Sequence, residues 1–571
     1  MAEKIISPGV FVNESDKSLV TQGPTVTGAA IVGPTVKGSP LIPTVVTSYS
    51  QYVSKFGESF KSGSQYYEYF TSMAAKEYFS GGGQSLLVTR IISGSAYNTY
   101  ATASVGSLDS GISFTLESLA YGTEANNIGP TSSLGALASG SSSNVRWEVS
   151  NTNSGSGTFT LIIRSGDDNT NNKNVLETFA NVSLDPQQPN FISRVIGDQK
   201  QVYVNADGGY LQLTGSYAVS SQYVRVAAVN TLQIDSIDND GNYKSAQYSG
   251  SLPSVGSGSI NGAFQGGVAA TNRVGLYFEN ITTSNNQGFN PTSGGDFDTA
   301  LTLITNADEY DFNLLLVPGM FIGNNALPIT TCQSRGDAFA IMDSVAYGST
   351  KTAAITAAAS STSNYGSIYW PWVQTFSSTL GKAVWVPASV VMAGVYAFND
   401  QVGAEWFAPA GLNRGGIGSV IRAERKLTST DRDALYAANV NPLATFPGEG
   451  VVAFGQKTLQ KNSTSLDRVN VRRLLINLKR FVSSVSRQLV FEQNTAVTRN
   501  RFLATVNPYM EQVVQKQGLY AYKVIMDDSN NTADVIDRNQ LVGQIYIQPT
   551  KTAEFIILDF TLQPTGATFP V

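Results

Sequence analysis

The sequence contains no histidine and a single cysteine, Cys332, among its 571 residues. Without histidine, the chain cannot carry a Ser-His-Asp or Cys-His catalytic group, histidine metal ligands or a histidine pH switch. One cysteine excludes an intramolecular disulfide and any zinc site built from several cysteines. We therefore interpret Cys332 as a buried structural thiol. We expect no metal, no cofactor and no enzymatic activity.

Charge and long apolar runs are also scarce. Charged residues make up 14% of the chain and the net charge is -5, which argues against a general nucleic-acid binder. No apolar run reaches about 18 residues, so we expect no insertion into a membrane. The opening "MAEKII" is too short and too charged for a signal peptide, which predicts synthesis in the cytosol. The abundant Gly, Ser, Thr and Asn suit a β-rich protein, an extracellular one, or one packed against its own copies.

The order of sequence patterns predicts a multidomain chain of mixed α/β and α+β class. Strand and helix patterns alternate in residues 20–95 and 266–405, which indicates one discontinuous α/β domain. Residues 96–265 consist of short alternating segments separated by turn residues, which predicts an all-β insertion. Residues 406–564 form the expected C-terminal α+β domain with a small sheet. Before them all, residues 1–19 carry an isolated strand candidate, Val10, Phe11 and Val12, on a polar tether.

Several individual elements follow from periodicity. The segment "SQYYEYFTSMAAKEYFS" (64–80) predicts a helix that ends at three glycines, and "TNRVGLYFEN" (271–280) predicts a strand. Two long helices are expected over 470–490 and 498–518. Three strands are expected after them, in "LYAYKVIMDD", "LVGQIYIQP" and "AEFIILDFTLQP".

The first of those long helices has a basic side. Its apolar residues, Leu474, Leu478 and Val482 among them, fall on one side of a helical wheel. Five basic residues fall on the other side: Arg472, Arg473, Lys479, Arg480 and Arg487, the first four being the candidates for docking. This pattern is typical of an ordinary solvated helix face, and equally of a strip that docks an acidic partner.

Short sequence patterns bear on two further functions, an adhesin and a glycosidase. The tripeptide Arg335-Gly336-Asp337 and the polar composition suggest a secreted β-rich adhesin, although three residues match often by chance and no secretion signal is present. A glycosidase needs a pair of carboxylates rather than a histidine. No recognisable motif holds such a pair, which makes an enzyme the weaker interpretation.

Long collinear motifs carry a more specific resemblance. These include "EWFAPAGLNRGGI", "LDRVNVRRLLINLKR", "FEQNTAVTRNRF", "VNPYMEQVVQKQGLYAYKV" and the opening "SPGVFVNE". Together they resemble the tail sheath proteins of contractile-tailed bacteriophages, especially the T4-like group. The resemblance is close over 400–571, clear over 1–95 and 310–400, and weak across 96–265.

This resemblance implies a structural virion subunit that assembles in the host cytoplasm. It implies stacked hexameric rings around a tail tube, with contraction that drives the tube through the host envelope without nucleotide hydrolysis. The implied partners are other copies of the chain, the tail tube protein, baseplate proteins and a tail terminator, with no direct contact to nucleic acid. The sheath of a phage-derived contractile injection particle would have the same mechanics and remains an alternative.

The resemblance also implies how the copies are linked. Terminal arms of two neighbours add strands to the C-terminal sheet of a third copy, an edge-addition mode that relies on main-chain hydrogen bonds. The donated strands would contain Val10, Phe11 and Val12 of the N-terminal arm, and Thr565, Ala567 and Phe569 of the C-terminal arm (565–571). The receiving sheet would contain Tyr522, Val524, Phe555 and Ile557. The C-terminal domain would lie innermost, with its basic residues toward the tube, and the insertion outermost.

Overall fold

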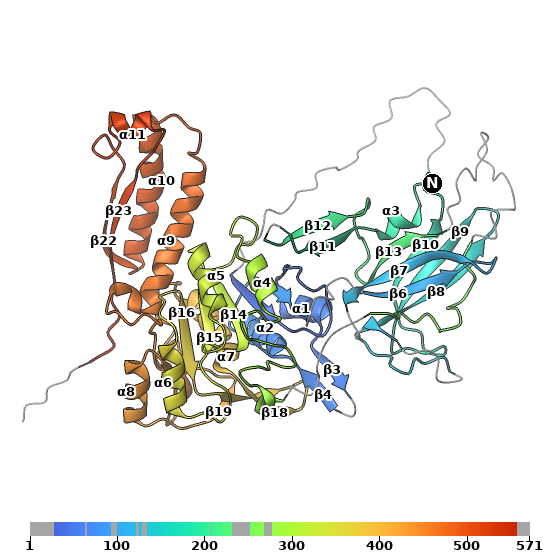
Figure 1. Ribbon diagram of the computed structural model, residues 1–571, viewed down its shortest axis with the longest axis horizontal. Coiled ribbons are helices and arrows are strands. Elements are labelled where there is room, and N and C mark those ends of the chain that lie inside the picture. Colours follow the sequence, from blue (N-terminus) through green and yellow to red (C-terminus); the bar gives the residue numbers. More distant parts are fainter. Residues whose placement is uncertain are drawn as a thin grey trace, which may run out of the picture.

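The computed structural model describes residues 28–62, 65–92, 100–121, 125–127, 134–206, 208–230, 252–267 and 277–556. Figure 1 shows three regions side by side: a central α/β body, a β-rich region on one flank and a pair of long helices on the other. The arms at 1–19 and 565–571 lie outside the described residues.

The centre of the body is an eight-stranded sheet. Its six inner strands run parallel, and an antiparallel strand closes each edge. The inner strands are short apolar runs that are buried along their length, as parallel strands covered on both faces require. In spatial order the strands are β2 (Thr44–Val46), β5 (Leu86–Arg90), β1 (Ala29–Gly33), β14 (Leu314–Phe321), β15 (Phe339–Asp343), β16 (Gly366–Trp370), β20 (Asn441–Phe446) and β21 (Gly450–Ala453).

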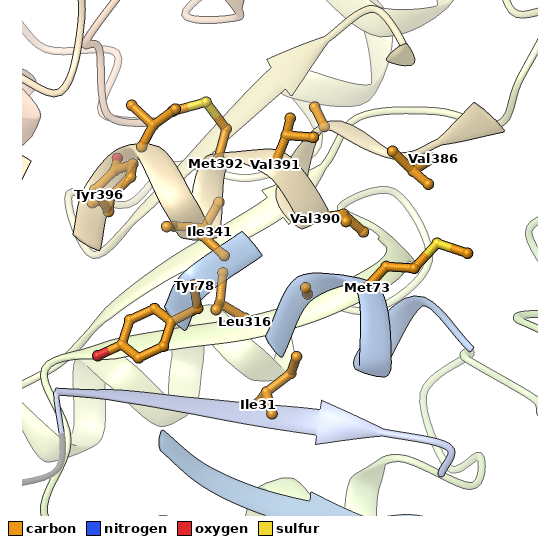
Figure 2. Packing of buried hydrophobic residues seen from close by; sticks show 14 of the residues in the cluster. Ile31, Met73, Tyr78, Leu316, Ile341, Val386, Val390, Val391, Met392 and Tyr396 are labelled. Atoms are coloured by element: carbon orange, nitrogen blue, oxygen red, sulfur yellow. The ribbon is translucent and has the colours of Figure 1, made fainter. Parts of the chain in front are cut away.

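Alternate residues of these strands feed two hydrophobic cores, one on each face of the sheet. Ile31 and Leu316 point to the face covered by α1 (Tyr49–Phe56), α2 (Phe70–Ser80) and α7 (Ala388–Val402), as Figure 2 shows in part. Their neighbours Val32 and Leu315 point to the opposite face. That face is covered by α4 (Asp298–Leu303), α5 (Leu327–Arg335), α6 (Lys351–Ala359) and α8 (Ser429–Ala437).

Helices α2 and α7 cross at a point where only glycine fits. A Cβ atom added to Gly81 would lie 2.3 Å from the carbonyl oxygen of Gly394. The close crossing brings apolar residues of both helices, such as Met73 and Val391, into one core (Figure 2). The predicted helix at 64–80 is therefore correct only from Phe70. Its first residues form β4 (Gln65–Glu68), which pairs with β3 (Ser59–Ser62).

A buried carboxylate joins the sheet to α7. The carboxylate of Asp343, at the end of β15, accepts hydrogen bonds from the backbone N–H (2.9 Å) and Oγ (2.7 Å) of Ser389 at the start of α7. It also accepts one from the N–H of Gly319 at 2.8 Å. Burial raises the pKa of Asp343 to about 6, while these hydrogen bonds favour the ionised form and limit the rise.

The β-rich flank contains two three-stranded antiparallel sheets with a core of their own. One sheet comprises β6 (Tyr100–Gly106), β7 (Ile112–Tyr121) and β13 (Val224–Val229), and the other β8 (Val145–Asn153), β9 (Thr158–Ser165) and β10 (Val175–Ser183). Phe114 and Phe159 stack between them, with ring centroids 5.6 Å apart. The flank also holds α3 (Ile192–Ile196) and the hairpin β11 (Lys200–Val204) and β12 (Tyr210–Thr214).

This β insertion also holds a buried charge network. Arg164 donates from Nε and Nη2 to the two carboxylate oxygens of Asp168, at 2.7 and 2.8 Å. Arg146 donates to the same carboxylate at 3.1 Å. All three side chains are at most 3% exposed. The network is therefore closed within the insertion.

The sheet of the body continues past residue 405, where the sequence predicts a domain boundary. Strands β20 and β21 and helix α8 all belong to the body, so that boundary is placed too early. Beside the large sheet lies a small one made of β17 (Val373–Ser377), β18 (Lys382–Val386) and β19 (Val420–Ala423). The strand expected over 271–280 is also wrong where it can be seen, because Phe278–Asn280 is the 3₁₀ helix η4.

The remaining flank is an antiparallel pair of helices with a two-stranded sheet. It comprises α9 (Val469–Arg487), α10 (Ala496–Gln515), β22 (Leu519–Ile525), α11 (Ala533–Asp537) and β23 (Gln544–Pro549), and the 3₁₀ helix η5 (Ser465–Asp467) precedes it. Both predicted long helices and two of the three predicted strands are confirmed. The third is wrong in its described part, because residues 553–556 are not a strand.

Candidate assembly surfaces

The sheet of the helical flank consists of the two strands β22 and β23. Within the described residues neither strand pairs with a third one. Tyr522 and Val524 turn one side of β22 onto the core between α9 and α10, and Tyr522 Oη donates to the carbonyl of Asn507 at 3.0 Å. Tyr520 and Tyr546 are exposed to solvent. The hairpin is thus supported from within, while its main-chain edges are free to accept another strand.

Just after β23, the chain is anchored to the body by Glu554. Its carboxylate accepts hydrogen bonds from Arg468 Nε at 2.7 Å, Tyr436 Oη at 2.9 Å and Gln456 Nε2 at 3.1 Å. Burial, followed by the nearby Glu554 charge, raises the pKa of Tyr436. Immediately beyond this anchor, Phe555 is exposed. Glu554 therefore fixes the point at which the C-terminal segment leaves the body.

The other residues predicted for strand exchange belong to the two terminal arms and to the later part of the predicted third strand. Val10, Phe11, Val12, Ile557, Thr565, Ala567 and Phe569 lie outside the described residues.

The basic side of α9 is not a solvated face throughout. Arg472 and Arg473 are both buried, which corrects the expectation for two of the four basic residues. The Arg472 guanidinium lies 3.6 Å from the ring centroid of Tyr365, and burial lowers its pKa. The physical reason is that α9 packs on two neighbours. Leu474 faces α10, while Ile476 belongs to a core of the body.

Three arginines of α9 form ion pairs with the body at intervals of seven residues. Arg473 binds Asp400 of α7 through two hydrogen bonds of 2.6 Å, Arg480 pairs with Asp311, and Arg487 pairs with Asp308 at 2.7 Å. Their side chains are 2%, 20% and 66% exposed, in that order. We call this series the arginine ladder. It attaches α9 to the body most firmly at the start of the helix.

The innermost pair of the ladder is electrostatically coupled. Burial disfavours the charged form of Arg473, but the Asp400 carboxylate outweighs burial, and the pKa of Arg473 is raised. Next to this pair, Asn477 Nδ2 donates to Glu405 at 3.2 Å. Of the four basic residues predicted for docking, Lys479 alone is classed as exposed.

Most of the C-terminal half of the chain matches two protein-family models. Residues 295–459 match the family model "Phage tail sheath protein central domain", and residues 461–563 match "Phage tail sheath C-terminal domain". Residues 295–459 and 461–563 thus correspond to the central and C-terminal domains of phage tail sheath proteins. The two matched segments meet between β21 and α9, where the body gives way to the helical flank.

Individual sheath proteins agree with this assignment. The chain is 40% identical over 185 residues to the tail sheath protein of Vibrio phage KVP40, and likewise to that of Enterobacteria phage T4. Each match covers 32% of this chain and 28% of the relative, so the chain spans less than a third of the length of either relative. In fold, it resembles a sheath tail protein from Listeria innocua, with a TM-score of 0.52 and 9% identity over 92% of this chain and 96% of the other.

The Arg-Gly-Asp tripeptide has an internal role in this structure. The Arg335 side chain is buried and donates to the carbonyls of Ile304 (2.7 Å) and Tyr310 (2.6 Å). It also forms an ion pair with Asp337 at 2.9 Å. An adhesion receptor could not reach this arginine, so the motif gives no support to the adhesin alternative.

Among the residues that the structure describes, no cluster of three or more Cys, Asp or Glu side chains could hold a metal ion. None of the described helices is both long enough and apolar enough to cross a bilayer.

Proposed function

We propose that this chain is the structural subunit of a contractile phage tail sheath. In this proposal, copies stack as hexameric rings around a tail tube in the virion, and contraction drives the tube through the host envelope. The partners are other copies of the chain, the tube protein, baseplate proteins and a tail terminator. The support is the match of 295–563 to two sheath domains, together with the similarity to T4-like sheath proteins.

One observation carries the assembly mechanism: the β22–β23 sheet has two strands, and no third strand of the described chain pairs with its edges. A two-stranded hairpin is marginal by itself, and exposed edges are a template for a strand from another chain. We assign the donated strands to Val10–Val12 and to residues 565–569 of two neighbouring copies. Main-chain hydrogen bonds then link the copies while the bodies they connect rotate.

In this proposal the free energy for contraction is stored in subunit packing and not in a bound nucleotide. Three of the four basic residues considered for contact with the tube make contacts within the molecule instead. Arg472 and Arg473 are buried, and Arg480 forms an ion pair with Asp311. Lys479 retains the exposure that contact with an acidic tube needs. Such a single exposed pair contributes only about 0–1 kcal/mol, which suits a sleeve that must slide.

Removal of residues 1–13 tests the proposal. We expect the truncated protein to keep the circular dichroism and thermal midpoint of the full chain, because the body and the helical flank have their own cores. We expect it to form no long sleeves in electron micrographs, whereas the full chain does. Normal sleeves from the truncated protein would refute strand donation. A full chain that forms neither rings nor sleeves under any condition would refute the sheath function.

A further inference from the structure

The connection between α9 and α10 ends in an exposed apolar group. Phe491 is fully exposed, and Val490 and Val497 beside it are exposed as well. We call these three residues the hairpin tip. Phe491 also has a φ of 70°, in the left-handed region that bulky residues rarely adopt. Soluble surfaces seldom hold a large aromatic ring outward on a strained backbone without a binding purpose.

The hairpin tip is held in place by polar contacts on both sides. Asn494 Nδ2 donates to the carbonyl of Gln540 at 2.9 Å, and the buried Arg499 donates to Asn494 Oδ1 at 2.9 Å. Thr498 Oγ1 donates to the carbonyl of Gln493 at 2.7 Å. The ring of Phe491 is therefore presented on an ordered support, which lowers the conformational entropy lost on binding.

A pocket of about 300 Å³ lies on the body, between β20, β21, α8 and the segment that follows β23, and its lining combines apolar residues with the charged Arg432, Asp433 and Glu554. Ala408, Ala410, Pro442, Phe454 and Phe555 supply its apolar lining. The guanidinium of Arg432 lies 5.8 Å from the ring centroid of Phe454 at this site. Both phenylalanines are exposed, so the pocket is open to an incoming group.

We propose that Phe491 of one copy inserts into this pocket of a second copy. In Figure 1 the α9–α10 connection lies at the top of the helical flank and α8 lies at the bottom of the same side, so the two features face opposite ends of one molecule. A contact between unlike ends of identical subunits repeats from copy to copy and builds a filament. The pocket has room for one aromatic ring, and its aromatic walls favour stacked or edge-on packing with that ring. This contact rests on the proposed function, because it requires the copies to polymerise.

The first test is Phe491→Ala, with Phe376→Ala as the matched control. Phe376 is an exposed phenylalanine of β17, far from both the tip and the pocket in sequence. We expect Phe491→Ala to raise the protein concentration needed for sleeve formation by about tenfold or more, as buried aromatic anchors do. The control should assemble like the unchanged protein. Equal assembly of both variants would overturn the proposal.

The second test traps the contact itself. The native Cys332 is fully buried, so engineered thiols would not compete with it. After mild oxidation of assembled protein, the double variant Val490→Cys, Ala410→Cys, which keeps the Phe491 ring, should give a ladder of disulfide-linked chains on a non-reducing gel, and each single variant should not. Sleeves without cross-links would refute this contact and leave the sheath function intact. Failure of the unchanged chain to form sleeves would refute both.

Discussion

In the β insertion, the buried arginines Arg146 and Arg164 pair with a carboxylate of the same domain, Asp168. Helix α9 instead directs its arginines across to the α/β body, where the arginine ladder meets Asp400, Asp311 and Asp308. The first arrangement stabilises one region by itself. The second makes the position of one region depend on another. Charge pairs of similar geometry thus stabilise the insertion from within and attach the helical flank to the body.

The strongest test of this contrast is Asp168→Asn. It would remove the carboxylate that Arg146 and Arg164 share and leave Arg164 only its ion pair with Glu148, and we expect the free energy of unfolding of the insertion to fall by about 3 to 5 kcal/mol. Hydrogen exchange should increase in β8 and β9 and stay unchanged in the eight-stranded sheet. Asp109→Asn, at an exposed position of the same domain, is the control. Faster exchange throughout the body would show that the insertion is not independent.

The matching change in the ladder is Asp400→Asn, which leaves Arg473 buried without its carboxylate. Because Asp400 is partly exposed, we expect a somewhat smaller loss, of about 3 to 4 kcal/mol. The region that loses stability should differ from the region affected by Asp168→Asn. Hydrogen exchange should increase along both α9 and α7, since the pair joins two regions. An effect confined to α9 would contradict the role of this pair in attachment.

Asp343 sharpens the comparison because it is buried against the hydrogen-bond donors of Ser389 and Gly319, and no arginine of the described chain forms an ion pair with it. Burial raises the pKa of Asp343 from its ordinary value of 3.8 to about 6, so the folded state holds the proton more tightly than the unfolded state. This contribution to stability is fully present below about pH 4 and is lost as the pH rises through 6, a change of about 3 kcal/mol.

The measurement for Asp343 is the unfolding free energy of the unchanged protein minus that of Asp343→Asn, taken from pH 3 to pH 7. Subtraction removes the contributions of the other carboxylates. We expect the difference to decline between about pH 4 and pH 6. A flat difference would mean that the carboxyl group titrates alike in the folded and unfolded states.

The smallest effect is expected at the outer end of the ladder. Asp308 and Arg487 are both mostly exposed, so Asp308→Asn should change the free energy of unfolding by less than about 0.5 kcal/mol. Raising the salt concentration should remove even that difference. A loss close to that of Asp400→Asn would show that the pairs act as one cooperative unit and not as a graded series.

Periodicity predicted α9, α10, β22 and β23 because each is long or strongly alternating and packs on a local core. It could not predict that Arg473 is buried. A helical wheel of α9 shows one apolar side, which packs on α10, and it does not show that the opposite side packs on the α/β body. The seven-residue spacing of Arg473, Arg480 and Arg487 was visible, but their aspartates are between 73 and 179 positions away.

Errors of assignment had a similar origin. Tyr66 and Tyr67 suit a strand as well as a helix, and the β3–β4 pairing decided between them. The place of β20 beside β16 could not be read from the sequence, because about 70 residues separate the two strands along the chain. The arms are known only through resemblance, and their residues lie outside the described chain.

The gradient in the arginine ladder gives the attachment of α9 a mechanical direction. A force that bends the hairpin tip away from the body loads the exposed Arg487 pair first, then Arg480, then Arg473, so the contacts break one at a time. A force along the helix axis loads all three pairs together and meets their combined resistance. We therefore expect the helical flank to separate from the body at a lower force when it is bent away than when it is pulled along the axis of α9.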